Sequence, residues 1–187
     1  MSVSTDQPRI LVMGVGNPLM GDEGVGPRAV ELLLTHYRFP DNVEVTDAGT
    51  MGFSILNLFQ GVDHVIVVDA VDGTGQEPGT VLKLDPDSMS PNQILHSLHD
   101  TRLTDVLDAA RLMGLEPDVA CIGVQVAQIV HWKVELSPVV EAALEPAVSA
   151  VVDLLAERGV TVEAAEPGVA DVARVIAALR TKGDMTG

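Results

Sequence analysis

The sequence predicts a three-layer α/β/α domain built on a mostly parallel, twisted central sheet of about five strands. Short β-branched runs alternate along the chain with segments whose apolar residues recur at helical spacing. Continuous apolar runs of this kind are typical of strands that are covered on both faces, as in parallel sheets. The 187 residues fit one ordinary domain, and their 47% hydrophobic content supports a sizeable buried core.

The first strand-loop-helix unit is expected over residues 9–37. The apolar run at 9–15 ends in glycines and predicts a buried strand, followed by a turn at 16–23. A helix is expected at 25–37, because Pro27 falls in the first turn, where its missing N–H removes no helical hydrogen bond.

The middle of the chain supplies three more predicted strands. A strand at 43–47 leads through a glycine-containing turn into a short helix that ends near Phe59. The run at 64–70 consists mainly of β-branched residues and predicts a fully buried strand. The segment 80–84 is short and precedes Pro86, so we expect an edge strand there.

The last third repeats the alternation of helix and strand. Asp100 can cap a helix with one apolar face, and a further strand is expected at 118–126. One long helix is predicted over 137–158, with Pro138 in its first turn.

Two parts are expected along the chain. The alternating pattern is complete within residues 1–159, which should form the α/β domain. Beyond Gly159 the composition turns rich in Ala, Val and Glu, so residues 160–187 are expected to be an appendage, with one helix at 169–182.

Charge and cysteine content narrow the class of protein. The formal net charge of -16 would repel nucleic acid phosphates and anionic lipid surfaces, so nucleic-acid binding is not expected. No apolar run approaches the roughly 20 residues that span a bilayer, so membrane insertion is not expected either. The single cysteine, Cys121, suits a reducing compartment, and we expect the cytoplasm.

Two glycine motifs after the first predicted strand are incomplete. Gly14 and Gly16 begin the dinucleotide-binding pattern G-x-G-x-x-G, but Leu19 stands where its third glycine belongs. The spacing that starts at Gly16 also fits a phosphate-binding loop, yet Asp22 and Glu23 replace its Lys and Ser or Thr. Two carboxylates would repel phosphate, so this turn suits a cation better.

The familiar hydrolase nucleophiles are not recognisable. Ser54 lacks the second glycine of G-x-S-x-G, and no H-E-x-x-H pattern is present. Cys121 lies inside an apolar strand, where a buried structural thiol is the expected role.

Three residues form a candidate metal site: Glu23 after the first strand, Asp69 at the end of the third, and His99 at the start of a helix. In open α/β sheets, ligands bind at the carboxyl ends of strands, where the strand order reverses. One imidazole and two carboxylates suit Ni, Zn, Fe or Mn. Structural alternatives remain: Asp22 can stabilise a helix N-terminus, and Asp69 can cap the next turn.

Other histidines compete for a role at this site. His96 lies three residues before His99 and is a rival ligand. His131 stands beside Trp132, and the pair can line a substrate groove.

Several motifs together resemble those of the hydrogenase maturation proteases, in the right order over residues 9–158. The motifs are Gly14-Val-Gly16-Asn17, Asp22-Glu23-Gly24-x-Gly26, Asp47-Ala-Gly49-Thr50, Val68-Asp69-Ala70, Ser97-Leu-His99-Asp100, Leu103-Thr-Asp105-Val-Leu107 and Leu136-Ser-Pro138. The second residue of the Asp47 motif is usually Gly in the family, and here it is Ala48.

The resemblance implies an aspartic-type endopeptidase that removes a C-terminal extension from the large-subunit precursor of a nickel-iron hydrogenase after nickel insertion. It places Glu23, Asp69 and His99 at metal-contacting positions. Asp47, Glu23 and Asp69 are then the candidate catalytic carboxylates. The nickel is expected in the precursor rather than bound permanently to the enzyme.

Two mechanisms and two further functions stay open from the residues. The metal can polarise the carbonyl or activate a water, or Asp47 or another carboxylate can be the general base. A non-catalytic nickel-binding chaperone would use the same three ligands. A nucleotide-binding module is disfavoured by the acidic turn.

Overall fold

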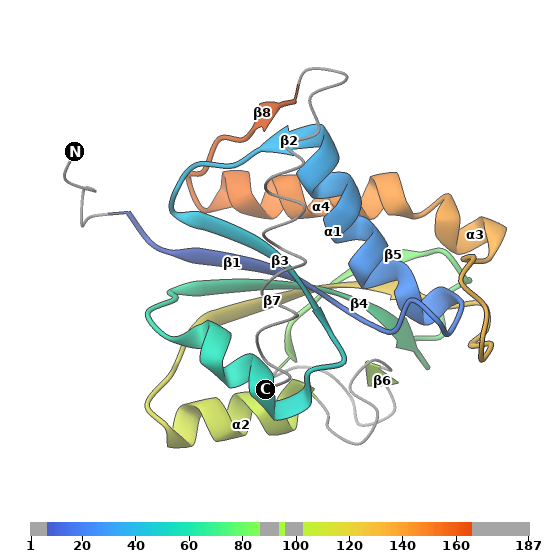
Figure 1. Ribbon diagram of the computed structural model, residues 1–187, viewed down its shortest axis with the longest axis horizontal. Helices are drawn as coiled ribbons and strands as arrows, with labels where there is room; N and C mark the ends of the chain where they lie inside the picture. The colour runs from blue at the N-terminus through green and yellow to red at the C-terminus, as the bar shows by residue number, and fades with distance from the viewer. Residues whose placement is uncertain (1–6, 87–93, 96–102, 166–187) are drawn as a thin grey trace.

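The computed structural model describes residues 7–86, 94–95 and 103–165 (Figure 1). Its elements are β1 (Ile10–Val15), η1 (Asp22–Gly24), α1 (Val25–His36), β2 (Tyr37–Arg38), β3 (Val43–Gly49), η2 (Gly52–Phe59), β4 (His64–Asp72), β5 (Val81–Leu84), β6 (Ile94–Leu95), α2 (Leu103–Leu112), β7 (Asp118–Gln125), α3 (Pro138–Glu141), α4 (Leu144–Glu157) and β8 (Glu163–Ala164). The expected alternation of strands and helices is therefore present, although η2 is a 3-10 helix.

The central sheet has the strand order β3-β1-β4-β7-β5, and the first four of these strands are parallel. β5 pairs antiparallel with β7 at the edge, as the short segment at 80–84 predicts, and β6 pairs antiparallel with β4. From β1 the chain crosses to β3 on one side and then returns to β4 on the other. The strand order thus reverses between β1 and β4, where ligands of such folds bind.

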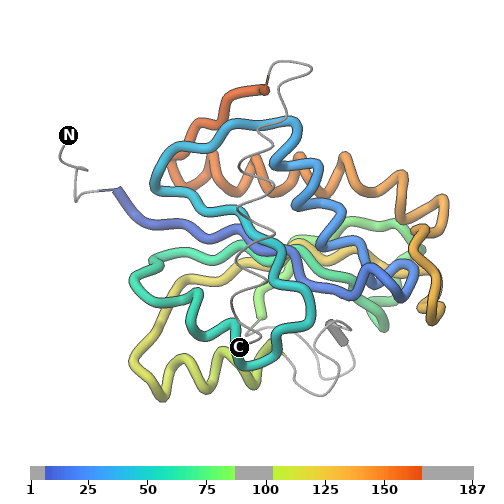
Figure 2. Tube along the Cα trace, viewed as in Figure 1, coloured from blue at the N-terminus to red at the C-terminus, as the bar shows by residue number. Residues whose placement is uncertain are grey.

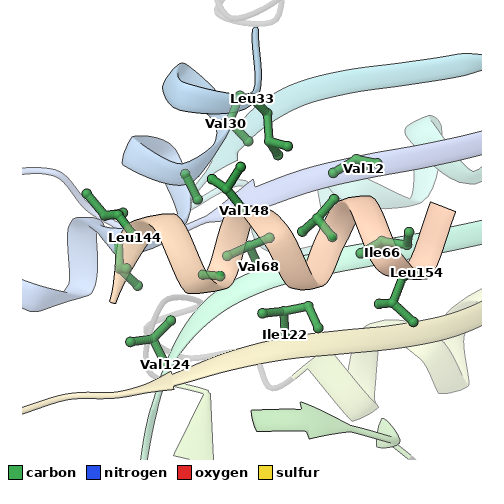
Figure 3. Close-up of a cluster of buried hydrophobic side chains, with 14 of the residues drawn as sticks. Val12, Val30, Leu33, Ile66, Val68, Ile122, Val124, Leu144, Val148 and Leu154 are labelled. Carbon is green, nitrogen blue, oxygen red and sulfur yellow. The ribbon is translucent and has the colours of Figure 1, made fainter. Parts of the chain in front are cut away.

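Helices cover both faces of the sheet, which confirms the three-layer α/β/α prediction. α1 and α4 lie on one face, and η2 and α2 lie on the other (Figure 1). Alternate residues of the strands point into the two cores; Figure 3 shows the larger core, which includes Val12, Val30, Leu33, Ile66, Val68, Ile122, Val124, Leu144, Val148 and Leu154. None of the helices that the structure describes has the length and apolarity needed to cross a membrane.

Two glycines let the start of α1 lie directly on the ends of the central strands. A Cβ at Gly26 would come within 2.2 Å of the Val15 carbonyl oxygen and 2.5 Å of the Val68 carbonyl oxygen. At Gly14 it would lie 2.3 Å from the Gly26 carbonyl oxygen. Any larger residue would push the helix away, so these glycines fix η1 and α1 over the β1-β4 junction.

The prediction of one long helix over 137–158 is wrong, because two helices occupy this segment. α3 ends at Glu141, and α4 begins at Leu144 after a turn. Pro146 explains the break: it has no N–H to donate to the carbonyl of Ala142, and its ring would clash there in a continuous helix.

The first residues beyond Gly159 are attached to the domain. Val160 is buried in the larger core, and β8 pairs antiparallel with β2. The N–H of Ala165 donates a hydrogen bond of 2.7 Å to the carbonyl of His36. The expected helix at 169–182 lies outside the described residues, and the domain boundary at Gly159 stays a prediction.

Truncation separates the attached residues from the rest of the tail. A chain that ends at Ala165 is expected to unfold at the wild-type denaturant concentration. A chain that ends at Gly159 should lose about 2 kcal/mol of unfolding free energy, because it lacks the buried Val160 side chain and β8. Denaturant titrations measure both values, and equal stability of the two chains would contradict a role for residues 160–165.

Candidate functional site

Two buried carboxylates lie at the junction of β1 and β4. Glu23 belongs to η1, which follows the carboxyl end of β1, and Asp69 lies near the carboxyl end of β4; each is 1% exposed. η1 packs against β4. Gly16 makes the tight turn possible, since a Cβ there would lie 2.0 Å from the Glu23 carbonyl oxygen. The fold therefore brings both predicted carboxylates to the strand-order reversal.

The Asp69 side chain lies just before the turn that follows β4. Its Oδ1 accepts a hydrogen bond of 2.7 Å from the N–H of Ala70, the adjacent residue. The next turn is capped by Asp72, whose Oδ1 accepts bonds from the Gly73 N–H and from Nε2 of Gln125. A structural role for Asp69 at this turn stays an alternative to its predicted role as a metal ligand.

Asp22 has a structural role different from stabilisation of a helix N-terminus. Its fully buried carboxylate accepts hydrogen bonds from the backbone N–H groups of Ala127, Gln128 and Ser137 at 3.0, 3.1 and 2.6 Å. The Ser137 hydroxyl donates a fourth bond at 2.9 Å. Asp22 thus ties the η1 turn to both ends of the segment 127–137.

Replacement of Asp22 by Asn should destabilise the protein by about 2 to 4 kcal/mol, because a neutral amide loses the charge and turns its NH₂ group toward N–H donors. The exposed Asp41→Asn serves as the matched control. Urea titrations measure the difference. A wild-type unfolding free energy for Asp22→Asn would contradict this account of the buried carboxylate.

Asp47 lies at the end of β3 and is partly buried. Its Oδ1 accepts a hydrogen bond of 2.8 Å from the Gly49 N–H. The pairing with β1 shifts register here, from Gly14 opposite Asp47 to Val15 opposite Gly49. The left-handed φ of 52° belongs to Gly49, and Ala48 is buried without a positive φ. Alanine is therefore compatible with this turn.

The third predicted ligand, His99, and its rival, His96, lie outside the described residues. Among the residues that the structure does describe, no three His, Cys, Asp or Glu side chains gather closely enough to hold a metal ion. Of the three predicted ligands, the structure describes Glu23 and Asp69, and metal binding by these two residues with His99 stays a prediction.

Cys121 is a buried thiol, as the sequence predicts. The thiol is completely buried in β7. Burial raises its pKa far above the ordinary value, and the negative charges of Asp69 and Asp85 raise this pKa further. A thiolate nucleophile is therefore strongly disfavoured at this position.

The contacts between the segment 127–137 and the turn before η1 are the part of the site region that sequence reasoning missed. Its backbone bridges the turn before η1, since the N–H of Gly21 donates to the Lys133 carbonyl and the N–H of Lys133 donates to the Leu19 carbonyl. Figure 2 shows both segments at the same end of the sheet. The signals in this part of the sequence were His131 beside Trp132 and the motif Leu136-Ser-Pro138.

Comparison with known proteins gives consistent results. The family model described as hydrogenase maturation protease matches residues 27–154. The chain is 39% identical to the hydrogenase expression/formation protein HupD of Bradyrhizobium diazoefficiens, over 95% of this chain and 93% of that protein. It is also 39% identical to the hydrogenase 2 maturation protease of Escherichia coli, over 81% and 93% of the two chains.

Solved structures agree with the sequence relatives. The hydrogenase maturating endopeptidase HybD from E. coli superimposes with a TM-score of 0.71 at 37% identity, over 83% of this chain and 97% of that chain. A hydrogenase 2 maturation peptidase from a Thaumarchaeota archaeon gives a TM-score of 0.60 at 35% identity, over 79% and 98%. With this fold, these buried carboxylates and these relatives, the chain belongs to the hydrogenase maturation protease family.

Proposed function

We propose that this protein is an aspartic-type endopeptidase that removes the C-terminal extension of a nickel-iron hydrogenase large-subunit precursor after nickel insertion. It recognises the nickel of the precursor through Glu23, Asp69 and His99. The nickel is part of the substrate and leaves with the product. Residence in the cytoplasm is part of the same proposal.

The observation that carries this proposal is the pair of buried carboxylates at the β1-β4 junction. Ligands of open α/β sheets bind at the carboxyl ends of the strands, where the strand order reverses. Glu23 and Asp69 are each 1% exposed. Glu23 follows β1 and Asp69 lies near the end of β4, and the strand order reverses between these two adjacent strands. Oxygen ligands together with an imidazole suit a divalent transition metal, which a precursor can present in an open coordination sphere.

The proposed reaction is hydrolysis of one peptide bond. Water attacks the carbonyl carbon, the C–N bond breaks, and the leaving amine takes a proton. The nickel in the precursor holds the scissile bond in place when it is bound by the enzyme's ligands. Asp47 is the candidate general base, since its carboxylate is partly exposed at the end of β3.

Mass spectrometry of the precursor tests the reaction. Purified protein is incubated with nickel-loaded precursor, and the precursor mass is measured before and after. A peptidase shortens the precursor by one defined C-terminal segment. A metal-holding chaperone leaves the mass unchanged, and that result would overturn the proposal.

A further inference from the structure

The molecule exposes an apolar surface beside the turn that carries Glu23. Leu19, Trp132 and Val134 are 48%, 88% and 62% exposed. The parallel bridge between Met20 and Lys133 brings the residues before them, Leu19 and Trp132, next to each other. Isolated exposed apolar residues are ordinary, but contiguous ones mark interaction surfaces. These three residues are called the apolar patch below.

The backbone at Trp132 is strained. Its φ of 61° lies in the left-handed region, and Trp132 is the one non-glycine residue with a positive φ among the residues described. Large side chains rarely adopt this conformation, and strain of this kind gathers at functional sites. Burial of this side chain does not offset the strain in the free protein, because Trp132 is 88% exposed. Burial of the ring in a complex would offset the strain.

The apolar patch is connected to the candidate site through the chain and through hydrogen bonds. Leu19 lies four residues before Glu23 in one turn. The other two patch residues lie in the segment 127–137, and Asp22 binds both ends of that segment. The hydrogen bonds of Asp22 and of the backbone of residues 19–21 therefore hold the apolar patch in fixed relation to Glu23.

The apolar patch lies beside a segment with few acidic side chains, in a protein that is otherwise strongly acidic. The chain carries a net charge of -16 with only 11 basic residues. Segment 127–137 contains Lys133 and His131 but a single acid, Glu135. The apolar patch is thus a local interruption of an acidic protein, and aromatic residues are frequent anchors in such interfaces.

We propose that Leu19, Trp132 and Val134 dock an apolar segment of the hydrogenase large-subunit precursor next to its nickel centre and so determine substrate specificity. This proposal rests on the proposed function. The docking contact does not involve the nickel, so the metal-free precursor binds the patch although it is not cleaved. Trp132 acts as the anchor that enters the precursor surface.

The single tryptophan gives a direct measurement of docking. Because Trp132 is the only tryptophan in the sequence, labelling with 5-fluorotryptophan produces one ¹⁹F NMR signal. Addition of unlabelled, metal-free precursor should shift or broaden this signal. An unchanged signal at saturating precursor would overturn the proposal, whether or not the protein cleaves nickel-loaded precursor.

Processing kinetics of nickel-loaded precursor supply the second measurement. The double variant Leu19→Ser, Trp132→Gly should lower kcat/KM at least about tenfold, mainly through a higher KM. Leu112→Ser is the matched control, because Leu112 is 90% exposed at the end of α2. It should process at the wild-type rate. Trp132→Gly alone should not lower Tm, since glycine relieves the left-handed strain.

The remaining outcomes separate the hypotheses. Wild-type kcat/KM in the double variant would overturn docking, and so would a lower kcat with an unchanged KM. If sedimentation shows that the wild type self-associates and the double variant does not, while kcat/KM is unchanged, the patch is a contact between copies of this chain. Absence of cleavage by the wild type would overturn the proposed function alone, because the ¹⁹F measurement still reports docking.

Discussion

The variants Glu23→Gln and Asp69→Asn should each lower the rate of precursor processing by at least about 100-fold, since even outer-sphere partners of a metal typically contribute 10- to 100-fold. Both substitutions keep the shape of the side chain and remove its charge. The two carboxylates are buried at the β1-β4 junction, and the neutral amides would weaken the proposed contact with the metal. His99→Ala should lower the rate by a similar factor.

Processing rates and unfolding curves together test these variants. Exposed acids serve as controls: Glu31→Gln on α1 for Glu23, and Asp41→Asn before β3 for Asp69. The controls should process at nearly the wild-type rate. Full activity of folded Asp69→Asn would contradict its proposed contact with the metal, and loss of folding would indicate a structural role instead.

Substitution of the adjacent acids Asp22 and Glu23 should affect two different properties of the protein. Asp22 is satisfied by four hydrogen bonds to the segment 127–137, so its charge contributes to stability. Glu23 follows directly in the chain and is equally buried. Asp22→Asn should therefore lower the unfolding free energy most, and Glu23→Gln should lower the processing rate most.

Periodicity was sufficient to predict the central architecture. Continuous apolar runs such as 64–70 identify strands with two covered faces, and such runs need no knowledge of distant contacts. The break between α3 and α4 was missed because Pro146 stands near the start of the second helix, where proline is tolerated, so the apolar pattern continues across it. β8 has only two residues and forms by pairing with β2 at a distance in sequence.

The candidate site was partly predictable for the same reason. A strand followed by an acidic turn places Glu23 at a strand end, and Asp69 interrupts an apolar strand, so topology alone brings them to one junction. The role of Asp22 was not predictable, because its hydrogen-bond partners lie 105 to 115 residues away. A local sequence pattern cannot predict a contact between residues so far apart in the chain.

The largest expected effect is dependence of cleavage on the metal in the precursor. Metal-free precursor should keep its extension, whereas nickel-loaded precursor should lose it. The reason is that the proposed ligands Glu23, Asp69 and His99 would form an incomplete set, which could bind a metal presented by another protein. Reagents that modify cysteine should have little effect, because Cys121 is completely buried and its pKa is raised.

The most direct measurement compares two preparations of one precursor, with and without nickel, after incubation with the same purified enzyme. Addition of nickel to the metal-free preparation, followed by enzyme, is the control for damaged precursor. The account predicts an unchanged mass for the metal-free form, and loss of one C-terminal segment from the nickel-loaded and reconstituted forms. Equal processing of the metal-free and nickel-loaded precursors would contradict metal recognition by Glu23, Asp69 and His99.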